Sequence, residues 1–243
     1  MSQNAILAKV LQAEQMLASG DVNGALSLAQ RLLPKAPADP GLNSLMALTL
    51  LRKGSLPQAE FYAKRALASE PRNLDVLLNY ALIQGANQDR PGAIATLEKA
   101  VAIDPSSHRA RLALANTLMD SHNTPEAIKH LKAALTHGPD TQVEVSLAGA
   151  LLNLGYIDEA AAFAREALAR HPDEPSLAAG YPNALTYKFG IDPDELATAH
   201  RAYGTLVDRL RPAGHNVPPR QATGPNRRLR VGVVSPDLRQ HSV

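Results

Sequence analysis

The stretch that decides the fold is residues 40–73, PGLNSLMALTLLRKGSLPQAEFYAKRALASEPRN. Its first half is a largely apolar run with a small residue, Ala47, near the middle, and Gly54 follows the run. A second run begins after Ser55 and ends before Pro71. A glycine between two runs of this length, and a proline after the second, predict two helices joined by a tight turn.

Three features of this stretch recur along the chain every 34 residues, with a last interval of 33. They are the proline after the second run and one alanine in each run. The columns are Pro37, Pro71, Pro105, Pro139 and Pro172; Ala13, Ala47, Ala81, Ala115 and Ala148; and Ala25, Ala59, Ala93, Ala127 and Ala160. An alanine-rich bundle without a fixed period does not place three columns in one register. The pattern resembles the tetratricopeptide repeat, a helix–turn–helix unit of about 34 residues.

This resemblance implies an all-α fold in which five helical hairpins stack into a right-handed superhelix, an α-solenoid. The repeats are expected within residues 1–174, at about 6–39, 40–73, 74–107, 108–140 and 141–173. Two helices approach closely only where a side chain is small, and alanine also has the highest helix propensity. We therefore expect both alanine columns to be buried between helices.

Residues that favour the N-cap position recur 34 apart just before the second helix of four repeats: Asp21, Ser55, Asp89 and Asn123. We expect their side chains to accept a hydrogen bond from the first helical turn. Ser55 with Gln58, and Asn123 with Glu126, also fit a capping box. In the fifth repeat this column holds Tyr156, which cannot cap in the same way.

The turn inside each repeat is a second variable position. Gly20, Gly54 and Gly155 occupy it in three repeats, whereas the third and fourth repeats have Gln88 and His122. Because only glycine adopts a positive φ angle without strain, we expect the turn to avoid that conformation at Gln88 and His122.

The repeat pattern ends after residue 173. A sixth repeat needs an unbroken helix, and Gly180-Tyr181-Pro182 is expected to interrupt it. Residues 175–211 are therefore interpreted as capping or connecting helices. The last of these is expected to start with Asp192 as N-cap, Pro193 as its first residue and Glu195 as the capping-box partner.

Residues 212–226, PAGHNVPPRQATGPN, contain four prolines and two glycines and are interpreted as a linker. Residues 227–243, RRLRVGVVSPDLRQHSV, include a β-branched run that predicts a strand. A single strand is not stable without partners. Either this is the first strand of a truncated α/β domain, or this end is disordered or docks elsewhere.

The last quarter of the chain carries a more specific resemblance. The segments YPNALTYKFGIDPDELATAHRAYG and RRLRVGVVSPDLRQHSV are similar to parts of the protein O-linked N-acetylglucosamine transferases, including their bacterial SPINDLY-like relatives (glycosyltransferase family 41). In that family the repeats select protein substrates, and a two-lobed GT-B domain transfers sugar from UDP-N-acetylglucosamine (UDP-GlcNAc) to serine or threonine. The resemblance implies that residues 227–243 are the first strand of such a domain.

Little of that family's catalytic site carries over to this sequence. His241 matches a histidine of the first catalytic-domain motif, which lies in the active site, while Leu238 stands where the motif usually has phenylalanine. The UDP-binding lobe has no counterpart. Because catalysis needs several groups held together, we expect this chain alone to lack transferase activity and to bind no cofactor.

The resemblance also implies a ladder of asparagines on the inner face of the superhelix. The corresponding column is Leu11, Leu45, Asn79, Ala113 and Ser146, so Asn79 alone matches the ladder. We take Asn79, Ser146, Asn116 and Asn153 as candidate residues for binding a protein or an extended peptide in the groove.

The composition limits the other functions. The 25 basic and 23 acidic residues give a net charge of +2, which does not indicate a nucleic acid or an anionic membrane as partner. Without cysteine, disulfides, thiolate metal sites and a cysteine nucleophile are excluded. The spacing of His108, His122, His130 and His137 fits no pattern of metal ligands. No secretory signal or membrane span is recognised, so a cytoplasmic location is expected.

Two functions remain open from the sequence. The first is the substrate-recognition half of a protein O-glycosyltransferase that is catalytically incomplete in this chain. The second is a free-standing adaptor that binds proteins and has no enzymatic role. In either case an uncovered end of the array is expected to favour homo-oligomers, because terminal repeats without a polar cap self-associate.

Overall fold

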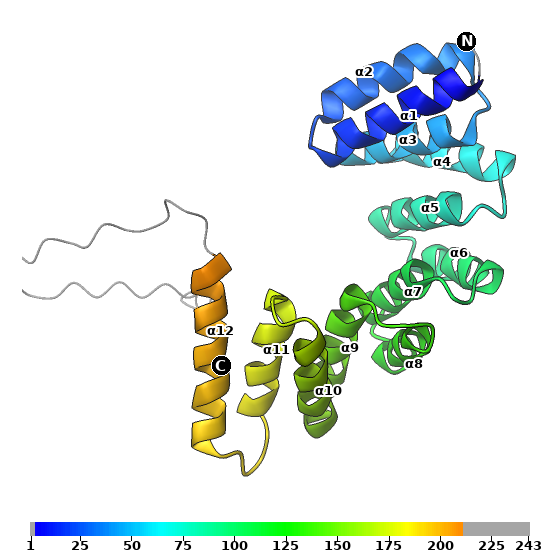
Figure 1. Ribbon diagram of the computed structural model, residues 1–243. Helices are drawn as coiled ribbons and strands as arrows, with labels where there is room; N and C mark the ends of the chain where they lie inside the picture. Colours follow the sequence, from blue (N-terminus) through cyan, green and yellow to red (C-terminus); the bar gives the residue numbers. More distant parts are fainter. Residues whose placement is uncertain (1–2, 211–243) are drawn as a thin grey trace, which may run out of the picture.

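The computed structural model describes residues 3–210, which form twelve α-helices and one short 3₁₀ turn, with no strand among them. Consecutive helices pair into antiparallel hairpins, and the hairpins stack on one another (Figure 1). The helices are α1 (Gln3–Ala18), α2 (Val22–Leu32), α3 (Pro40–Arg52), α4 (Leu56–Ser69), α5 (Leu74–Ala86), α6 (Arg90–Ile103), α7 (His108–Asp120), α8 (Thr124–Leu135), α9 (Thr141–Asn153), α10 (Ile157–Arg170), α11 (Pro175–Thr186) and α12 (Pro193–Leu210).

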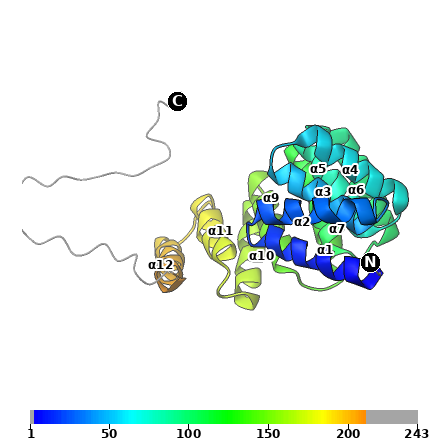
Figure 2. The same ribbon diagram turned by 90° about the horizontal axis from the view of Figure 1, so that it is seen from above.

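The stacked hairpins form a curved, superhelical rod, seen from the side in Figure 1 and from above in Figure 2. Neighbouring odd-numbered helices contact one another from α1 through α11. The odd-numbered helices α5, α7 and α9 lie on the inner side of the bend and α6, α8 and α10 on the outer side (Figure 1). The prediction of an all-α solenoid is therefore confirmed. The expected linker at 212–226 and strand within 227–243 lie outside the described residues.

The two predicted alanine columns are the contacts that hold the hairpins together. All ten alanines are buried, with at most 7% of their surface exposed. Those with no exposed surface at all are Ala13, Ala25, Ala47, Ala59, Ala115 and Ala127. The prediction that small side chains mark the helix–helix contacts is confirmed. The remaining volume is filled mainly by leucines, of which Leu45, Leu114 and Leu147 are examples.

The buried side chains fall into two main clusters. One joins α1 to α4 and includes a single fully buried residue of α5, Ile83. The other runs from α5 to α12 and begins with Ala81. Helix α5 therefore contributes to both clusters, and its neighbouring side chains mark the boundary between them.

The N-cap predictions are confirmed in two repeats and wrong in two. Asp21 and Asp89 accept hydrogen bonds from the backbone N–H groups of Gly24 and Gly92, at 2.9 and 3.0 Å. A Cβ atom at either glycine would lie 2.1 Å from the second carboxylate oxygen. An aspartate cap in this backbone geometry is therefore tied to glycine three residues later.

Ser55 and Asn123 form no side-chain capping bond, so the two predicted capping boxes do not exist. In these repeats Gln58 and Glu126 occupy the position of the glycine, where a Cβ atom collides with a cap in the geometry of Asp21 and Asp89. Glu126 instead pairs with Lys129, Oε2 to Nζ, at 2.6 Å.

A second column of caps escaped the sequence analysis. Each residue of this column precedes an odd-numbered helix by one position and accepts a hydrogen bond from the first turn: Asp39, Asn73, Ser107 and Asp140. The intervals are 34, 34 and 33 residues, and each cap follows a proline of the proline column, by two residues in three repeats and by one in the fourth. Both helices of these repeats therefore begin at residues that the sequence repeats in register.

The turn inside the repeat has a positive φ angle in every one of the five repeats. Gln88 and His122 have φ angles of 62° and 61°, close to those of Gly54 and Gly155 at 76° and 77°. The expectation that Gln88 and His122 avoid this conformation is wrong. The packing of the two flanking helices fixes the conformation of the turn, and the backbone at Gln88 and His122 is strained as a result.

The prediction that Gly180-Tyr181-Pro182 interrupts a helix is wrong. Helix α11 runs through the buried Pro182, packs against α9 and α10, and forms a sixth hairpin with α12. The missing N–H of Pro182 removes one helical hydrogen bond, and burial of the helix outweighs that loss. Helix α12 starts at Pro193 as predicted, and Asp192 accepts from the Asp194 N–H at 2.9 Å. Glu195 does not complete a capping box; it accepts from the Tyr181 hydroxyl.

Candidate functional site: the inner groove

The inner side of the bend holds a pocket of about 460 Å³ between α5, the first half of α6 and α7. Its floor is apolar, and polar side chains stand at its edge. The lining residues are Leu78, Ala81, Leu82, Gly85, Ala86, Arg90, Leu97, Ala113, Asn116, Thr117 and Asp120. Leu82 remains 56% exposed although it is a large apolar residue. A pocket of this composition suits an apolar side chain flanked by polar backbone.

Of the four predicted site residues, only Asn116 lines this pocket. It is exposed on α7, in the column that follows the alanine column and that Leu82 occupies on α5. Within residues 3–210 its amide forms no hydrogen bond, so both the donor and the acceptor of that amide are free to pair with a partner.

The structure does not bring the other three predicted residues into the pocket. Asn79 is half-buried on α5, and Ser146 is half-buried on α9. Asn153 is exposed at the end of α9. The column that holds Asn79 and Ser146 also holds Leu45, which is fully buried. This column faces the contact between neighbouring helices as much as the groove, so it offers no continuous ladder.

Two charged residues at the pocket edge were missed by the sequence analysis. Arg90 is the first residue of α6 and Asp120 the last residue of α7. Both are exposed, and within residues 3–210 neither has an ion pair or hydrogen bond. A signal existed, because Asp120 lies five residues after the alanine column, at the same register as Asn153.

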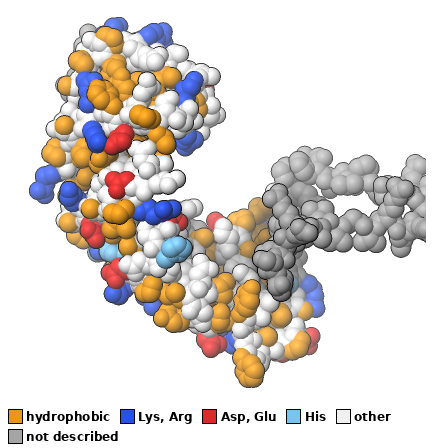
Figure 3. All heavy atoms as spheres, turned by 180° about the vertical axis from the view of Figure 1, so that it is seen from behind, with side chains coloured by type: hydrophobic (Ala, Val, Ile, Leu, Met, Phe, Trp, Pro, Cys, Tyr) orange, Lys and Arg blue, Asp and Glu red, His pale blue; other side chains and the backbone are white. Residues whose placement is uncertain are grey.

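Charges also line the inner face toward the N-terminal end. Asp75 on α5 pairs with Arg109 on α7, with Oδ1 and Nη1 2.8 Å apart. Partial burial, and secondly the charge of Asp75, raise the pKa of Glu14 on α1. Figure 3 shows a face on which acidic, basic and apolar side chains are mixed along the curve. The pocket itself is lined by one cation and one carboxylate, Arg90 and Asp120, so neither sign of charge dominates it.

Two of the histidines considered in the sequence analysis, His108 and His130, are half-buried. His108 Nε2 lies 2.9 Å from the carbonyl oxygen of Gly138, which links α7 to the turn before α9. Burial lowers the pKa of His130, and the charge of Arg111 acts in the same direction. Residues 3–210 contain no group of three histidine, aspartate or glutamate side chains that could hold a metal ion. Over the same residues, no helix has the length and apolar character needed to span a membrane.

Known proteins provide an independent view of the fold. Residues 44–108 and 86–146 each match a family model of the tetratricopeptide repeat. No curated protein matches the chain.

Several solved structures share the architecture. TTC0263, a thermophilic TPR protein of Thermus thermophilus, aligns with a TM-score of 0.61 and 24% identity over 74% of this chain and 99% of its own. PilF of Pseudomonas aeruginosa aligns with a TM-score of 0.69 and 18% identity over 86% of this chain and 93% of its own. A MamA protein aligns with a TM-score of 0.59 and 18% identity over 70% of this chain and 94% of its own.

These similarities establish the repeats and the fold, and they give no support for a glycosyltransferase parentage. The periodic columns, the buried alanines and the matches to family models agree on one assignment. The repeats within residues 44–146 are tetratricopeptide repeats, and residues 3–210 fold as a tetratricopeptide-repeat solenoid, a scaffold suited to protein–protein interaction.

Proposed function

We propose that this protein is an adaptor that holds an extended segment of a partner protein in its inner groove, centred on the pocket between α5 and α7. The observation that carries the proposal is the combination of an apolar floor with unpaired polar side chains at the edge. A concave surface built by stacked repeats is the usual binding surface of solenoid proteins.

The lining residues suggest how such a segment is held. An apolar side chain of the partner fits over Leu78, Leu82 and Leu97, which form the floor of the pocket. The amide of Asn116 both donates and accepts, so it can pair with the N–H and C=O of one residue of an extended backbone. Arg90 and Asp120 then favour opposite charges on the residues that flank the apolar anchor.

The experiment is a selection of peptides from a displayed random library on the full chain, followed by calorimetric measurement of Kd. We expect the selected peptides to share one large apolar residue. Asn116→Ala is expected to weaken binding by about five- to tenfold, the loss typical of one or two backbone hydrogen bonds. Leu82→Asp should abolish binding, because it places a charge at the apolar anchor.

Asn123→Ala is a matched control, since Asn123 is an exposed asparagine at the start of the outer helix α8 and makes no side-chain capping bond. Peptides that bind Leu82→Asp as tightly as the unchanged protein would place the binding site elsewhere.

A second candidate is the substrate-recognition half of a protein O-GlcNAc transferase, in which the same groove presents serine or threonine segments to a catalytic domain. The sequence RRLRVGVVSPDLRQHSV favours it, and His241 of that sequence lies outside the described residues. On this hypothesis the selected peptides are rich in serine and threonine around the anchor. The 243-residue chain should show no heat of binding with UDP-GlcNAc, and specific binding would contradict the prediction that the nucleotide site is incomplete.

A further inference from the structure

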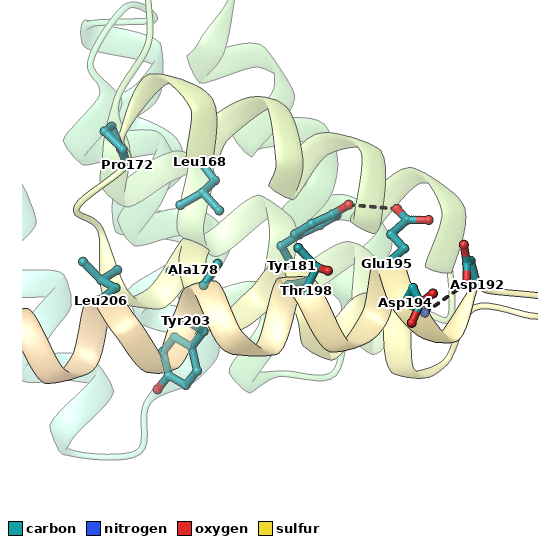
Figure 4. Close-up of a pocket in the computed structure, with 12 residues that line it drawn as sticks. Leu168, Pro172, Ala178, Tyr181, Asp192, Asp194, Glu195, Thr198, Tyr203 and Leu206 are labelled. Carbon is teal, nitrogen blue, oxygen red and sulfur yellow. Dashed lines mark hydrogen bonds between the residues drawn. The ribbon is translucent and has the colours of Figure 1, made fainter.

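The last hairpin contains a groove that is separate from the pocket on the inner side of the bend. It runs along α12, between that helix, α11 and the end of α10 (Figure 4). One part has a volume of about 650 Å³, and a second part of about 580 Å³ continues it toward the end of α12. The two parts share Pro172, Ala202 and Leu206. The groove therefore follows α12 over most of its length.

Helix α12 is poorly covered for a helix of the array. It buries only Ala199 and Leu206 among its 18 residues, whereas α10 buries four alanines among 14. Val207 and Leu210 remain 38% and 48% exposed near its end. An amphipathic helix that leaves this much apolar surface open is short of a packing partner.

The two ends of the groove differ in chemistry. Leu168, Ala178 and Leu206 form an apolar end, and Asp192, Asp194 and Glu195 gather at the other end (Figure 4). Within the described part of the chain none of these three carboxylates forms an ion pair.

Neighbouring polar groups at the acidic end offset only part of its negative charge. Glu195 accepts a hydrogen bond from the hydroxyl of Tyr181 at 3.1 Å. Burial and Glu195 raise the pKa of the Tyr181 hydroxyl, and the charge of Arg165 on α10 acts in the opposite direction. An occupant that suits the whole groove must be apolar over one stretch and carry several positive charges next to it.

The chain itself carries a segment of this kind directly after α12. Of the 25 basic and 23 acidic residues, six arginines and one aspartate lie after Leu210, which leaves 19 basic and 22 acidic residues up to that point. The charges of the two parts are therefore opposite. Three of the arginines, Arg227, Arg228 and Arg230, lie at the start of a short segment that continues with the apolar residues Val231, Val233 and Val234.

The connection is long enough. The chain leaves α12 at the same end as the apolar part of the groove, and the acidic end lies about 21 Å back along the helix at 1.5 Å per residue. The 16 residues between Leu210 and Arg227 span up to about 53 Å when extended. The segment can therefore fold back along α12 without strain in the connection.

We propose that residues 227–234, RRLRVGVV, bind in this groove of the same chain. The arginines pair with Asp192, Asp194 and Glu195, and the apolar residues cover the uncovered side of α12. Residues that form the first strand of a folded α/β domain cannot lie in the groove at the same time. The proposal and the transferase hypothesis therefore exclude each other for a chain that carries such a domain.

The absence of cysteine allows a direct test by disulfide cross-linking of the full chain. One cysteine replaces Gly232 in the segment and the other replaces Thr198 in the groove. The matched control pairs Gly232→Cys with His200→Cys, an exposed position two residues further along α12 that does not line the groove. Both positions are about equally far from Leu210, so tethering alone favours neither.

The expected result is an intramolecular cross-link that forms at least about tenfold faster at Thr198 than at His200, since docking raises the effective concentration of one thiol near the other. Equal rates at the two positions overturn the proposal. A cross-link that forms only between two chains also overturns it, because the groove then receives a second copy.

Charge reversal supplies a second, independent measurement. Asp194→Lys alone and Arg230→Glu alone should each slow the cross-link about three- to fivefold at low ionic strength, and the combination should restore the rate. Glu98→Lys on α6, an exposed carboxylate away from the groove, is the control and should leave the rate unchanged. Failure of the combined variant to recover the rate refutes the proposed ion pairing.

Discussion

The guanidinium of Arg170, the last residue of α10, holds the carboxylate of Glu144 on α9. Its Nη2 and Nε lie 2.7 and 3.0 Å from Oε1 of Glu144. The side chain of Glu144 is only 2% exposed, whereas that of Arg170 is 44% exposed. The ring of His171 lies on the other side, with Nε2 2.9 Å from Oε2. The buried carboxylate of Glu144 is therefore paired with two more exposed side chains, at the place where the fifth hairpin meets α11.

Arg170→Met is expected to lower the free energy of unfolding by about 3 kcal/mol, because it leaves the buried carboxylate without its main partner. Urea denaturation measures the change. Lys132→Met is the control: Lys132 on α8 and Glu159 on α10 pair at 2.7 Å between the fourth and fifth hairpins, but both are about half exposed. An exposed pair contributes at most about 1 kcal/mol. Equal losses in the two variants would show that burial of Glu144 is not what makes its pair important.

The left-handed turns at Gln88 and His122 predict a gain in stability on substitution. A non-glycine residue pays about 1–2 kcal/mol for this conformation, and glycine costs about 0.5–1 kcal/mol in the unfolded chain. His122→Gly should therefore raise the free energy of unfolding by about 0.5–1 kcal/mol. Gly155→Ala, at a φ angle of 77°, should lower it by a similar amount. A loss of stability in His122→Gly would mean that the imidazole makes a contribution beyond the backbone.

The alanine columns predict a low tolerance for larger side chains. Ala115 is fully buried between helices, so Ala115→Leu should destabilise the array by about 1–3 kcal/mol through overpacking. Ala95 lies on an exposed position of the outer helix α6, and Ala95→Leu should change stability by less than about 0.5 kcal/mol. Thermal unfolding followed by circular dichroism distinguishes the two. Similar melting temperatures would contradict close packing at Ala115.

Glu14 predicts a dependence of stability on pH. Burial and the charge of Asp75 raise its pKa in the folded state above the ordinary value of 4.5. Between that value and the raised pKa the folded state binds more protons than the unfolded state. Stability should therefore fall as the pH rises through this window.

Glu14→Gln removes this ionisation and should flatten that part of the curve, measured by urea denaturation from about pH 4 to about pH 7. Asp75→Asn should shift the fall to lower pH without removing it, because burial remains the larger cause. Unchanged curves in Glu14→Gln would assign the pH dependence to another group.

Helix α1 predicts self-association at the start of the array. Leu7 and Leu11 are 58% and 50% exposed on α1, the first helix of the array. A second copy that covers this face would bury both side chains. We expect light scattering to show a mass that rises with concentration, and Leu7→Glu with Leu11→Glu to abolish the rise. A mass that stays at that of one chain at all concentrations would remove the oligomer hypothesis.

The sequence predicted most of the architecture because the decisive contacts are local and repeat. Ala47 and Ala59 are buried because each faces a neighbouring helix at the same register in every unit, and a fixed interval reveals such positions directly. The sequence failed where packing overrides local preference. His122 adopts a positive φ angle and Pro182 lies inside a helix because the surrounding hairpins fix the path of the chain.

The candidate site was less predictable. Asn116 could be proposed from its register, and it lines the pocket. The roles of Arg90 and Asp120 depend on the distance between α6 and α7 at the pocket edge, and that distance follows from how two repeats stack. The same holds for the groove beside α12, which results from the position of one helix relative to α10 and α11.

The division of the buried side chains at α5 has a mechanical consequence. Ile83 belongs to one cluster and Ala81 to the other, so the boundary between the two clusters lies within the single helix α5. When the rod is pulled from its two ends in a force experiment, we expect the two clusters to separate first at α5, so that the protein extends in two steps. On this expectation, the rod is least resistant to force at the helix where the proposed binding pocket begins.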